Sequence, residues 1–246
     1  MIKNIAKRIL PKKIKNQITS LLQLWGVLTP ISKRECNICE YKGFFMNFGR
    51  PLRLDARCPS CDSLERHRLL MLAINRGEIN NFENQNASVL HFAPEKILEE
   101  IFRKKFINYQ TADLFAKADI VLNLENIDVE NEKYDIIVAN HVLEHVDDRK
   151  AASELSRILK KGGVLVCQVP IVEGWITTYE NDSMISEDER WLHFGQGDHV
   201  RFYGADFRER ICDGGFDLVK ECTSQGADVI KHGLLRGEKV FIFKKK

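Results

Sequence analysis

The sequence lacks a hydrophobic run long enough to cross a membrane as a helix. The uncharged stretch between Lys15 and Lys33 is only 17 residues long, carries several polar side chains and is broken by Pro30. A spanning helix needs about 20 predominantly apolar residues. A signal peptide is also a poor interpretation, because the basic region is too long and no small-residue cleavage site follows. We therefore expect a cytoplasmic protein.

The sequence also lacks an even number of cysteines and a strong net charge. Seven cysteines exclude a fully paired disulfide framework. The 37 basic and 35 acidic residues give a net charge of +2, which indicates no particular class of partner. The apolar share of 44% and charged share of 29% are typical of an ordinary globular protein and exclude a fibrous or wholly disordered chain.

The charge is unevenly distributed along the chain. Residues 1–34 carry eight basic side chains and no acid, so the remainder carries 29 basic and 35 acidic groups, a net −6. This arm has apolar side chains at helical spacing on both sides of Pro11. These side chains are Ile2, Ile5, Ile9, Leu10, Ile14, Ile18, Leu21 and Leu22. Two interpretations are equally open: peripheral contact with an anionic membrane, or packing of the apolar stripe on the main domain.

Four of the cysteines form two C-x-x-C pairs 18 residues apart. The pairs are Cys36 with Cys39 and Cys58 with Cys61. This spacing favours a tetrahedral zinc site with four thiolate ligands over a redox function. With all four positions filled by protein, the zinc would be structural. The sequence thus predicts a zinc-ribbon-like module with a following helix over residues 35–80.

The first turns of that helix carry Arg66 and Arg68. Either side chain could contact a phosphate or a substrate anion, although solvated surface charges are the more ordinary interpretation. The polar, Asn-rich stretch 77–88 predicts the domain boundary.

From residue 88 onward, apolar strands alternate with helical patterns. Expected strands cover 88–93, 108–114, 119–124, 134–140 and 164–171, with a helix over 148–160 that ends at Gly162 and Gly163. Such buried runs between helices predict a doubly wound, mostly parallel sheet over 86–246. Ligands of such sheets bind beyond the carboxyl ends of the strands. The strand-end residue Asp113 is placed to bind both hydroxyls of a ribose, which indicates a nucleoside-containing cofactor.

At these residues the sequence resembles the class I S-adenosylmethionine-dependent methyltransferases, especially the type 11 group. The most specific part is YDIIVANHVLEHVD over 134–147, followed by ELSRILKKGGVLVCQVP, DHVRFYG over 198–204 and GGFD over 214–217. The segment CPSCDSLERHRLL resembles the Cys-rich leader of a bacterial subset. The resemblance implies a seven-stranded Rossmann-like fold, S-adenosylmethionine as cofactor and methyl transfer.

The first motif departs from the family's acidic residue followed by G-x-G-x-G. His91 stands in place of the acid, and Ala93 and Glu95 stand where glycines are expected. Ala93 is small enough for close approach of a ligand, and Glu95 could meet the ammonium group of the cofactor. The resemblance also implies that Asp113, Asn123, Leu124 and Asn140 bind the cofactor. The leading catalytic candidates are His199 and His145, with His141 as a weaker one, because a hydroxyl acceptor benefits from a general base.

The sequence therefore predicts a methyltransferase that acts on a small-molecule or glycan-type acceptor. An RNA methyltransferase that uses the zinc module for RNA contact is the first alternative, but the net −6 outside the arm speaks against nucleic acid. A non-catalytic methyltransferase-fold binding module is the second, since the glycine loop is altered.

Overall fold

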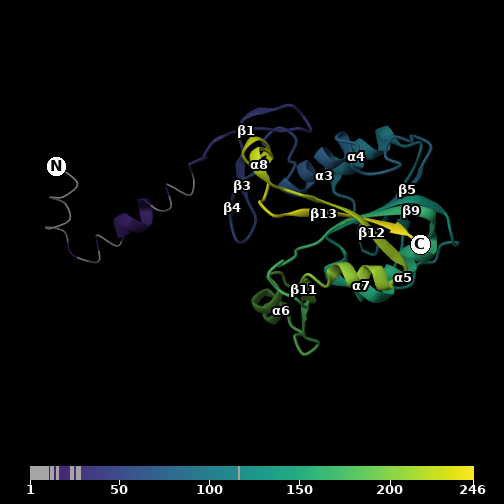
Figure 1. Cartoon of the computed structure of the whole chain (residues 1–246). Helices are drawn as coiled ribbons and strands as arrows, with labels where there is room; N and C mark the ends of the chain where they lie inside the picture. Colours follow the sequence, from purple (N-terminus) through teal and green to yellow (C-terminus); the bar gives the residue numbers. More distant parts are fainter. Residues whose placement is uncertain (1–10, 12–13, 15–16, 23–24, 26–28, 116) are drawn as a thin grey trace.

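A seven-stranded sheet forms the centre of the molecule (Figure 1). The computed structural model describes residues 11, 14, 17–22, 25, 29–115 and 117–246. The strand order is β12-β13-β9-β8-β5-β6-β7, and within it only β13 runs antiparallel to its neighbours. The α/β fold with a mostly parallel sheet is thus confirmed. The strands are β5 (Ser88–Phe92), β6 (Asn108–Asp113), β7 (Ile120–Val121), β8 (Tyr134–Asn140), β9 (Leu159–Gln168), β12 (Phe216–Thr223) and β13 (Lys239–Lys245).

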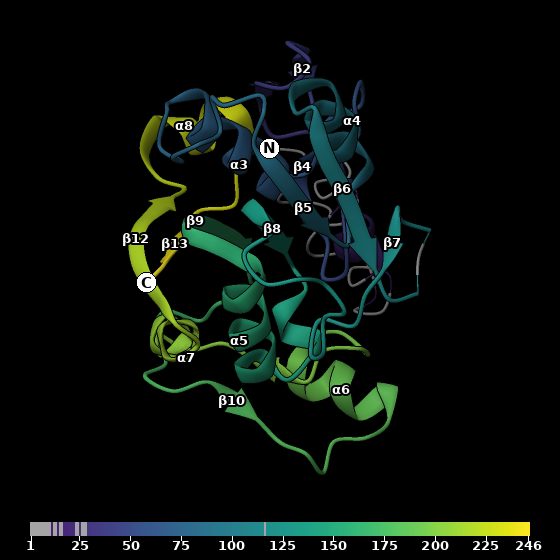
Figure 2. The same cartoon turned by 90° about the vertical axis from the view of Figure 1, so that its right-hand side faces the viewer.

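Both faces of the sheet are buried, which explains the nearly continuous apolar runs in its strands. In β8, Ile136 and Val138 point into one core, while Ile137 and Ala139 point into the other. Figure 2 shows α3 and α4 over the first face and α5 and α7 over the second. The helices of the two layers are α3 (Glu65–Asn75), α4 (Lys96–Lys105), α5 (Asp148–Ile158) and α7 (Phe207–Asp213).

The segments outside these layers are short. They comprise η1 (Leu143–His145), β10 (Tyr179–Glu180), α6 (Glu187–Phe194), β11 (Arg201–Phe202) and α8 (Gly226–His232). The motif glycine Gly214 allows α7 to approach α5, because a Cβ there would lie 2.5 Å from the Cβ of Ala152. The order of β5, β6 and β8 reverses at β5, so the carboxyl ends of β5 and β8 flank the switch point where ligands of this architecture bind.

The fifth predicted strand begins earlier than its apolar run suggests. α5 ends at Ile158 and β9 starts at Leu159, so Gly162 and Gly163 lie inside the strand rather than ending the helix. The pairing of β8 with β9 shifts register between Tyr134 and Ile136. Gly162 has a φ of +73°, and this irregularity accommodates the extra residues.

The cysteine-containing segment folds as two small antiparallel ribbons. These are β1 (Lys33–Glu35) with β2 (Lys42–Phe44), and β3 (Met46–Phe48) with β4 (Arg53–Arg57). The segment contacts the C-terminal part of the chain, since His232 Nδ1 lies 2.7 Å from the Glu35 carbonyl oxygen. α3, which the sequence assigns to the 35–80 module, packs in the same core as β5 and β8.

The described part of the N-terminal arm exposes its apolar side chains. Ile14, Ile18, Leu21, Leu22 and Trp25 are all exposed, and the helical residues 17–22 stand apart from the body in Figure 1. The first half of the predicted apolar stripe, Ile2 to Leu10, lies outside the described residues. Among the residues that the structure describes, no helix is long and apolar enough to cross a membrane.

Arg68 is fully buried and joins three segments of the chain. Its guanidinium donates hydrogen bonds to the carbonyl oxygens of Ala56, Ser63, His232 and Gly233. It also lies over the ring of Phe45, 4.6 Å from the centroid. Arg68 therefore neither contacts a phosphate nor lies in solvent, and both sequence-based interpretations of this residue are wrong.

We expect Arg68→Met to destabilise the protein strongly. The substitution keeps the length of the side chain but leaves four backbone carbonyls without their donor, a loss of about 3 to 5 kcal/mol in the free energy of unfolding. Urea denaturation measures this loss. Arg76→Met is the matched control, because Arg76 is half-exposed in its ion pair with Asp228 and should change the free energy by about 1 kcal/mol or less. Equal effects of the two substitutions would contradict the role of Arg68.

Candidate active site

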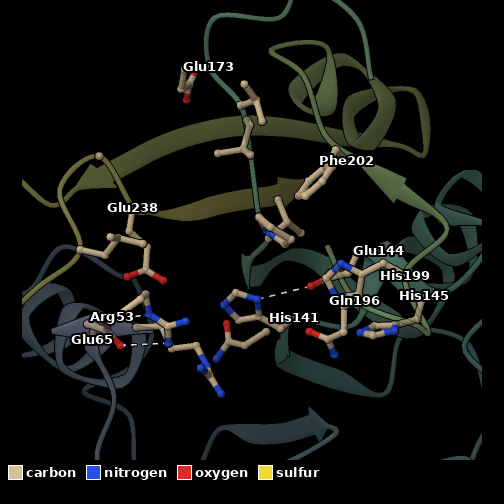
Figure 3. A pocket seen from close by; sticks show the side chains of 18 of the residues that line it. Arg53, Glu65, His141, Glu144, His145, Glu173, Gln196, His199, Phe202 and Glu238 are labelled. Atoms are coloured by element: carbon tan, nitrogen blue, oxygen red, sulfur yellow. Dashed lines mark hydrogen bonds and ion pairs between the residues drawn. The ribbon is translucent and has the colours of Figure 1, made fainter. Parts of the chain in front are cut away.

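A cavity of about 830 Å³ opens at the carboxyl ends of β5, β8 and β9 (Figure 3). Its floor comes from residues at the ends of these strands and directly after them. The floor residues are Ala93, Glu95, Asn140, His141, Val169 and Pro170. One wall comes from the segment after β9, and the opposite wall from the cysteine module and the segment between α8 and β13. The cavity therefore lies where the strand order reverses, as the sequence predicts for a ligand site.

Two floor residues adopt a backbone conformation that favours glycine. Ala93 has a φ of +45° and His141 a φ of +51°. Residues other than glycine hold such conformations at a cost of about 1 to 3 kcal/mol, and they cluster at ligand sites. Ala93 stands where the methyltransferase motif has a glycine, so the chain keeps the glycine-type turn without the glycine.

Glu95 is anchored from α3 through one carboxylate oxygen. Its Oε1 accepts hydrogen bonds from Arg66 Nε at 3.0 Å and from His67 Nε2 at 3.2 Å, and its buried Oε2 lies 3.8 Å from His91 Nε2 without a hydrogen bond. Burial alone raises the pKa of Glu95, but His67, His91 and Arg66 hold this pKa well below its usual range. Burial in turn lowers the pKa of His67. A carboxylate thus faces the cavity at neutral pH.

Of the remaining predicted cofactor residues, one lines the cavity and one lies beneath it. Asn140 is buried on the cavity floor, and neither side-chain atom of its amide has a partner. His91 is buried beneath the floor, where its Nδ1 lies 2.8 Å from the Tyr109 hydroxyl, and it does not line the cavity.

Asp113, Asn123 and Leu124 also lie outside the cavity lining. Asp113 ends β6, and its Oδ1 accepts a hydrogen bond from the Phe115 amide at 2.7 Å. Asn123 Oδ1 accepts from the Glu125 amide, and Leu124 packs in the core. The cavity therefore lies between the β5–α4 loop and the end of β8. The residues predicted to bind the ribose and the adenine lie outside it, at the end of β6 and shortly after β7.

The two predicted catalytic histidines lie together at one end of the cavity. The rings of His145 and His199 are 4.7 Å apart and perpendicular. His145 Nδ1 lies 3.2 Å from the Asp198 carbonyl oxygen, and the buried Nδ1 of His199 has no partner. Burial lowers the pKa of His199, which favours its neutral form.

Glu144 lies beside these histidines and was missed by the sequence reasoning. It is fully buried, its pKa is raised by burial but lowered more strongly by His141 and His145, and the net pKa is below the usual value. His141 Nδ1 lies 3.3 Å from its Oε1 (Figure 3). A charged residue between the apolar Leu143 and Val146 was the available signal, because a buried charge there needs a partner.

The cysteine module supplies part of the cavity wall. Arg53, Glu65 and Arg66 line the cavity, and Arg53 Nε donates to Glu65 Oε1 at 2.8 Å. Residues 235–238 continue this wall. No local pattern marks these residues as a site, since only the folded chain brings them to the sheet edge.

The four cysteine sulfurs fit a tetrahedral metal ion. All four lie within 4.8 Å of one another. The Sγ atoms of Cys36 and Cys61 are 3.6 Å apart, and those of Cys39 and Cys58 are 3.7 Å apart. Zinc–sulfur bonds of about 2.3 Å in a tetrahedron place the sulfurs about 3.8 Å apart. The other three cysteines are distant from this group and lie in or beside the core.

Glu238 gives the cavity wall a pH-dependent stability. Burial raises the pKa of Glu238 to about 7 from an ordinary value of 4.5, against the lowering effect of His141, Arg66 and Arg53. The folded state therefore binds more protons than the unfolded state between these two pH values. The free energy of unfolding falls as the pH rises through this interval and levels off above it.

We expect Glu238→Gln to remove this loss of stability. The variant should match the wild type near pH 4.5 and exceed its free energy of unfolding by on the order of 2 kcal/mol at pH 8. Urea denaturation of both proteins over this pH range measures the difference. A difference that does not change with pH would contradict the titration of Glu238 in this interval.

Comparison with known proteins agrees with the fold. The chain matches the methyltransferase-domain family over residues 66–221. A solved structure of the Burkholderia thailandensis 1,6-didemethyltoxoflavin-N1-methyltransferase shares 14% identity, covers 74% of this chain and 78% of its own, and has a TM-score of 0.51. An S-adenosylmethionine-dependent methyltransferase from Mesorhizobium loti shares 12% identity, covers 66% and 93%, and has a TM-score of 0.48. No curated protein matches the sequence.

The fold is that of the class I S-adenosylmethionine-dependent methyltransferases. The family match spans more than half of the 246 residues, so the chain belongs to the methyltransferase-domain family. The enzyme class that the sequence resemblance implied is thus confirmed.

Proposed function

We propose that this methyltransferase transfers the methyl group of S-adenosylmethionine to a small-molecule or glycan-type acceptor. The observation that carries the proposal is the structure of the loop between β5 and α4. Ala93 keeps the glycine-type turn, and Glu95 lines the cavity beside it. A carboxylate at this point matches the ammonium group of the cofactor's methionine end.

The donor set of the floor fits the polar end of the cofactor. Asn140 offers an unpaired buried amide, and Ala93 leaves room for close approach. Asp113 at the end of β6 is proposed to bind the ribose hydroxyls, with Asn123 and Leu124 beside the adenine. When bound, the cofactor supplies an electrophilic methyl group, and the chain's contribution is to orient the acceptor toward it.

The acceptor class is argued from the cavity. Its volume of about 830 Å³ lies in the range of about 300 to 1,000 Å³ that is typical of small-molecule sites. Its walls mix apolar side chains, such as Ile171 and Phe202, with the polar Gln196 and Glu173. His199 and His145 also line the cavity and are proposed to assist removal of the acceptor's proton.

Neither arginine that motivated an RNA acceptor is free to bind one. Arg68 is buried on backbone carbonyls, and Arg66 is paired with Glu95. We therefore do not propose nucleic acid as a partner. We also propose a cytoplasmic location with peripheral contact at an anionic membrane. The exposed side chains of Ile14, Ile18 and Leu21 in a basic arm support this contact.

Calorimetry with S-adenosylmethionine tests the cofactor site. We expect the wild type to bind one equivalent, and Ala93→Leu to weaken binding at least about tenfold because the longer side chain enters the cavity. Ala93→Gly is the matched control and should bind as the wild type does, since glycine accepts the positive φ. Production of S-adenosylhomocysteine from pooled small molecules or oligosaccharides then identifies the acceptor. The absence of cofactor binding by the intact, metal-loaded wild type would overturn the proposal.

We also propose that the four-cysteine cluster holds a structural zinc ion. Purified protein should contain one zinc per chain. Cys36→Ser should lose that zinc and lower the free energy of unfolding by several kcal/mol, because the small ribbons have little core of their own. Cys212→Ser is the control and should keep the metal. Metal analysis with denaturation measures both effects, and a zinc-free wild type of unchanged stability would refute the assignment.

A further inference from the structure

A second group of metal-binding side chains lies inside the cavity. Glu144 and His145 belong to η1, and His199 comes from the segment before β11. Each offers one ligand atom, and these three atoms lie within 4.8 Å of one another. All three residues line the cavity and lie close together at one end of it (Figure 3).

Two of these side chains have buried atoms without a partner. Glu144 has no exposed surface; its Oε1 lies 3.3 Å from His141 Nδ1, and its Oε2 has no hydrogen-bond partner. His199 is 7% exposed, and its Nδ1 also has no partner. A buried carboxylate is costly unless it is paired or coordinates a cation. The unpaired atoms therefore point to a missing positive ligand.

The backbone around the cluster is rigidly held. Arg201 donates to the carbonyl oxygens of Leu143 and Val146, and the Tyr203 hydroxyl donates to the Leu143 carbonyl at 2.9 Å. The Val200 amide donates to the Glu144 carbonyl at 3.0 Å, so the segment that carries His199 is attached directly to η1. Such support keeps ligand side chains in place before a metal binds.

We propose that Glu144, His145 and His199 form a binding site for a divalent transition-metal ion that is open to the acceptor. Two imidazoles and one carboxylate with free positions suit ions such as Mn²⁺, Fe²⁺ and Zn²⁺. Metal–nitrogen bonds of about 2.1 Å hold ligand atoms about 3 to 4 Å apart. Small side-chain rotations bring the three atoms within this range.

A cation here has a defined part in the proposed reaction, and this part rests on the proposed function. An acceptor hydroxyl that binds the cation gives up its proton to solvent more easily, because the positive charge stabilises the oxyanion. That oxygen then bonds to the methyl carbon as the carbon–sulfur bond breaks, and the sulfonium of the cofactor becomes a neutral thioether. His145 and His199 thus assist deprotonation as ligands.

Manganese binding to the full-length, zinc-loaded protein tests the site directly. Mn²⁺ prefers nitrogen and oxygen ligands over thiolates, so it does not compete for the four cysteines. Calorimetry and electron paramagnetic resonance with MnCl₂ report its binding without any acceptor. We expect one equivalent to bind the wild type, and Glu144→Gln and His199→Gln each to weaken binding about tenfold or more.

The matched control is His193→Gln. His193 lies in α6, hydrogen-bonds to Tyr179 at 2.6 Å and does not line the cavity, so this variant should bind Mn²⁺ as the wild type does. Circular dichroism verifies folding of each variant. If Glu144→Gln does not fold, His199→Gln decides alone. A wild type that binds no Mn²⁺, or folded variants that bind it equally well, would overturn the inference.

Cofactor calorimetry on the same proteins separates this inference from the proposed function. Mn²⁺ binding at the cluster without S-adenosylmethionine binding rejects the proposed function and keeps the cation site. The reverse result rejects the cation site and leaves the methyltransferase function standing.

Discussion

The buried guanidinium of Arg68 holds together the segments that build one wall of the cavity. It binds carbonyl oxygens from β4, from the turn before α3 and from the turn after α8. Arg53 and Glu65 flank two of these segments, and residues 235–238 follow the third. Because carbonyls buried without a donor are costly, these segments keep one arrangement. The shape of the site therefore depends on a residue that touches no ligand.

A second link connects that wall to the floor of the cavity. Arg66 and His67 of α3 both bind Glu95, the residue that follows the altered glycine loop. A glycine in place of Glu95 would have no side chain with which to make this link. The departure from the family motif is thus coupled to the module in front of the methyltransferase fold. One continuous set of contacts thus connects the four-cysteine cluster, α3 and the loop between β5 and α4.

The sheet could be predicted because both of its faces are covered. Strands buried on both faces need nearly continuous apolar residues, and these runs are visible in the sequence. β8 has the predicted bounds 134–140, and β5 and β6 each end one residue earlier than predicted. β9 begins earlier than expected, because pairing with β8 overrides the tendency of Gly162 and Gly163 to end a helix. The floor residues Ala93, Glu95 and Asn140 could be named from the sequence, since strand ends at a switch point meet by topology.

The sequence by itself determined the α/β fold, the pairing of the C-x-x-C motifs and the strand ends that face the ligand. These features depend on local periodicity and spacing. The tertiary structure alone decided that Arg68 is a buried anchor, that Glu238 faces the cavity and that Glu144 meets His199. Each of these depends on a contact between residues far apart in the chain. Such contacts leave no local pattern, because burial and charge pairing arise only when distant segments pack together.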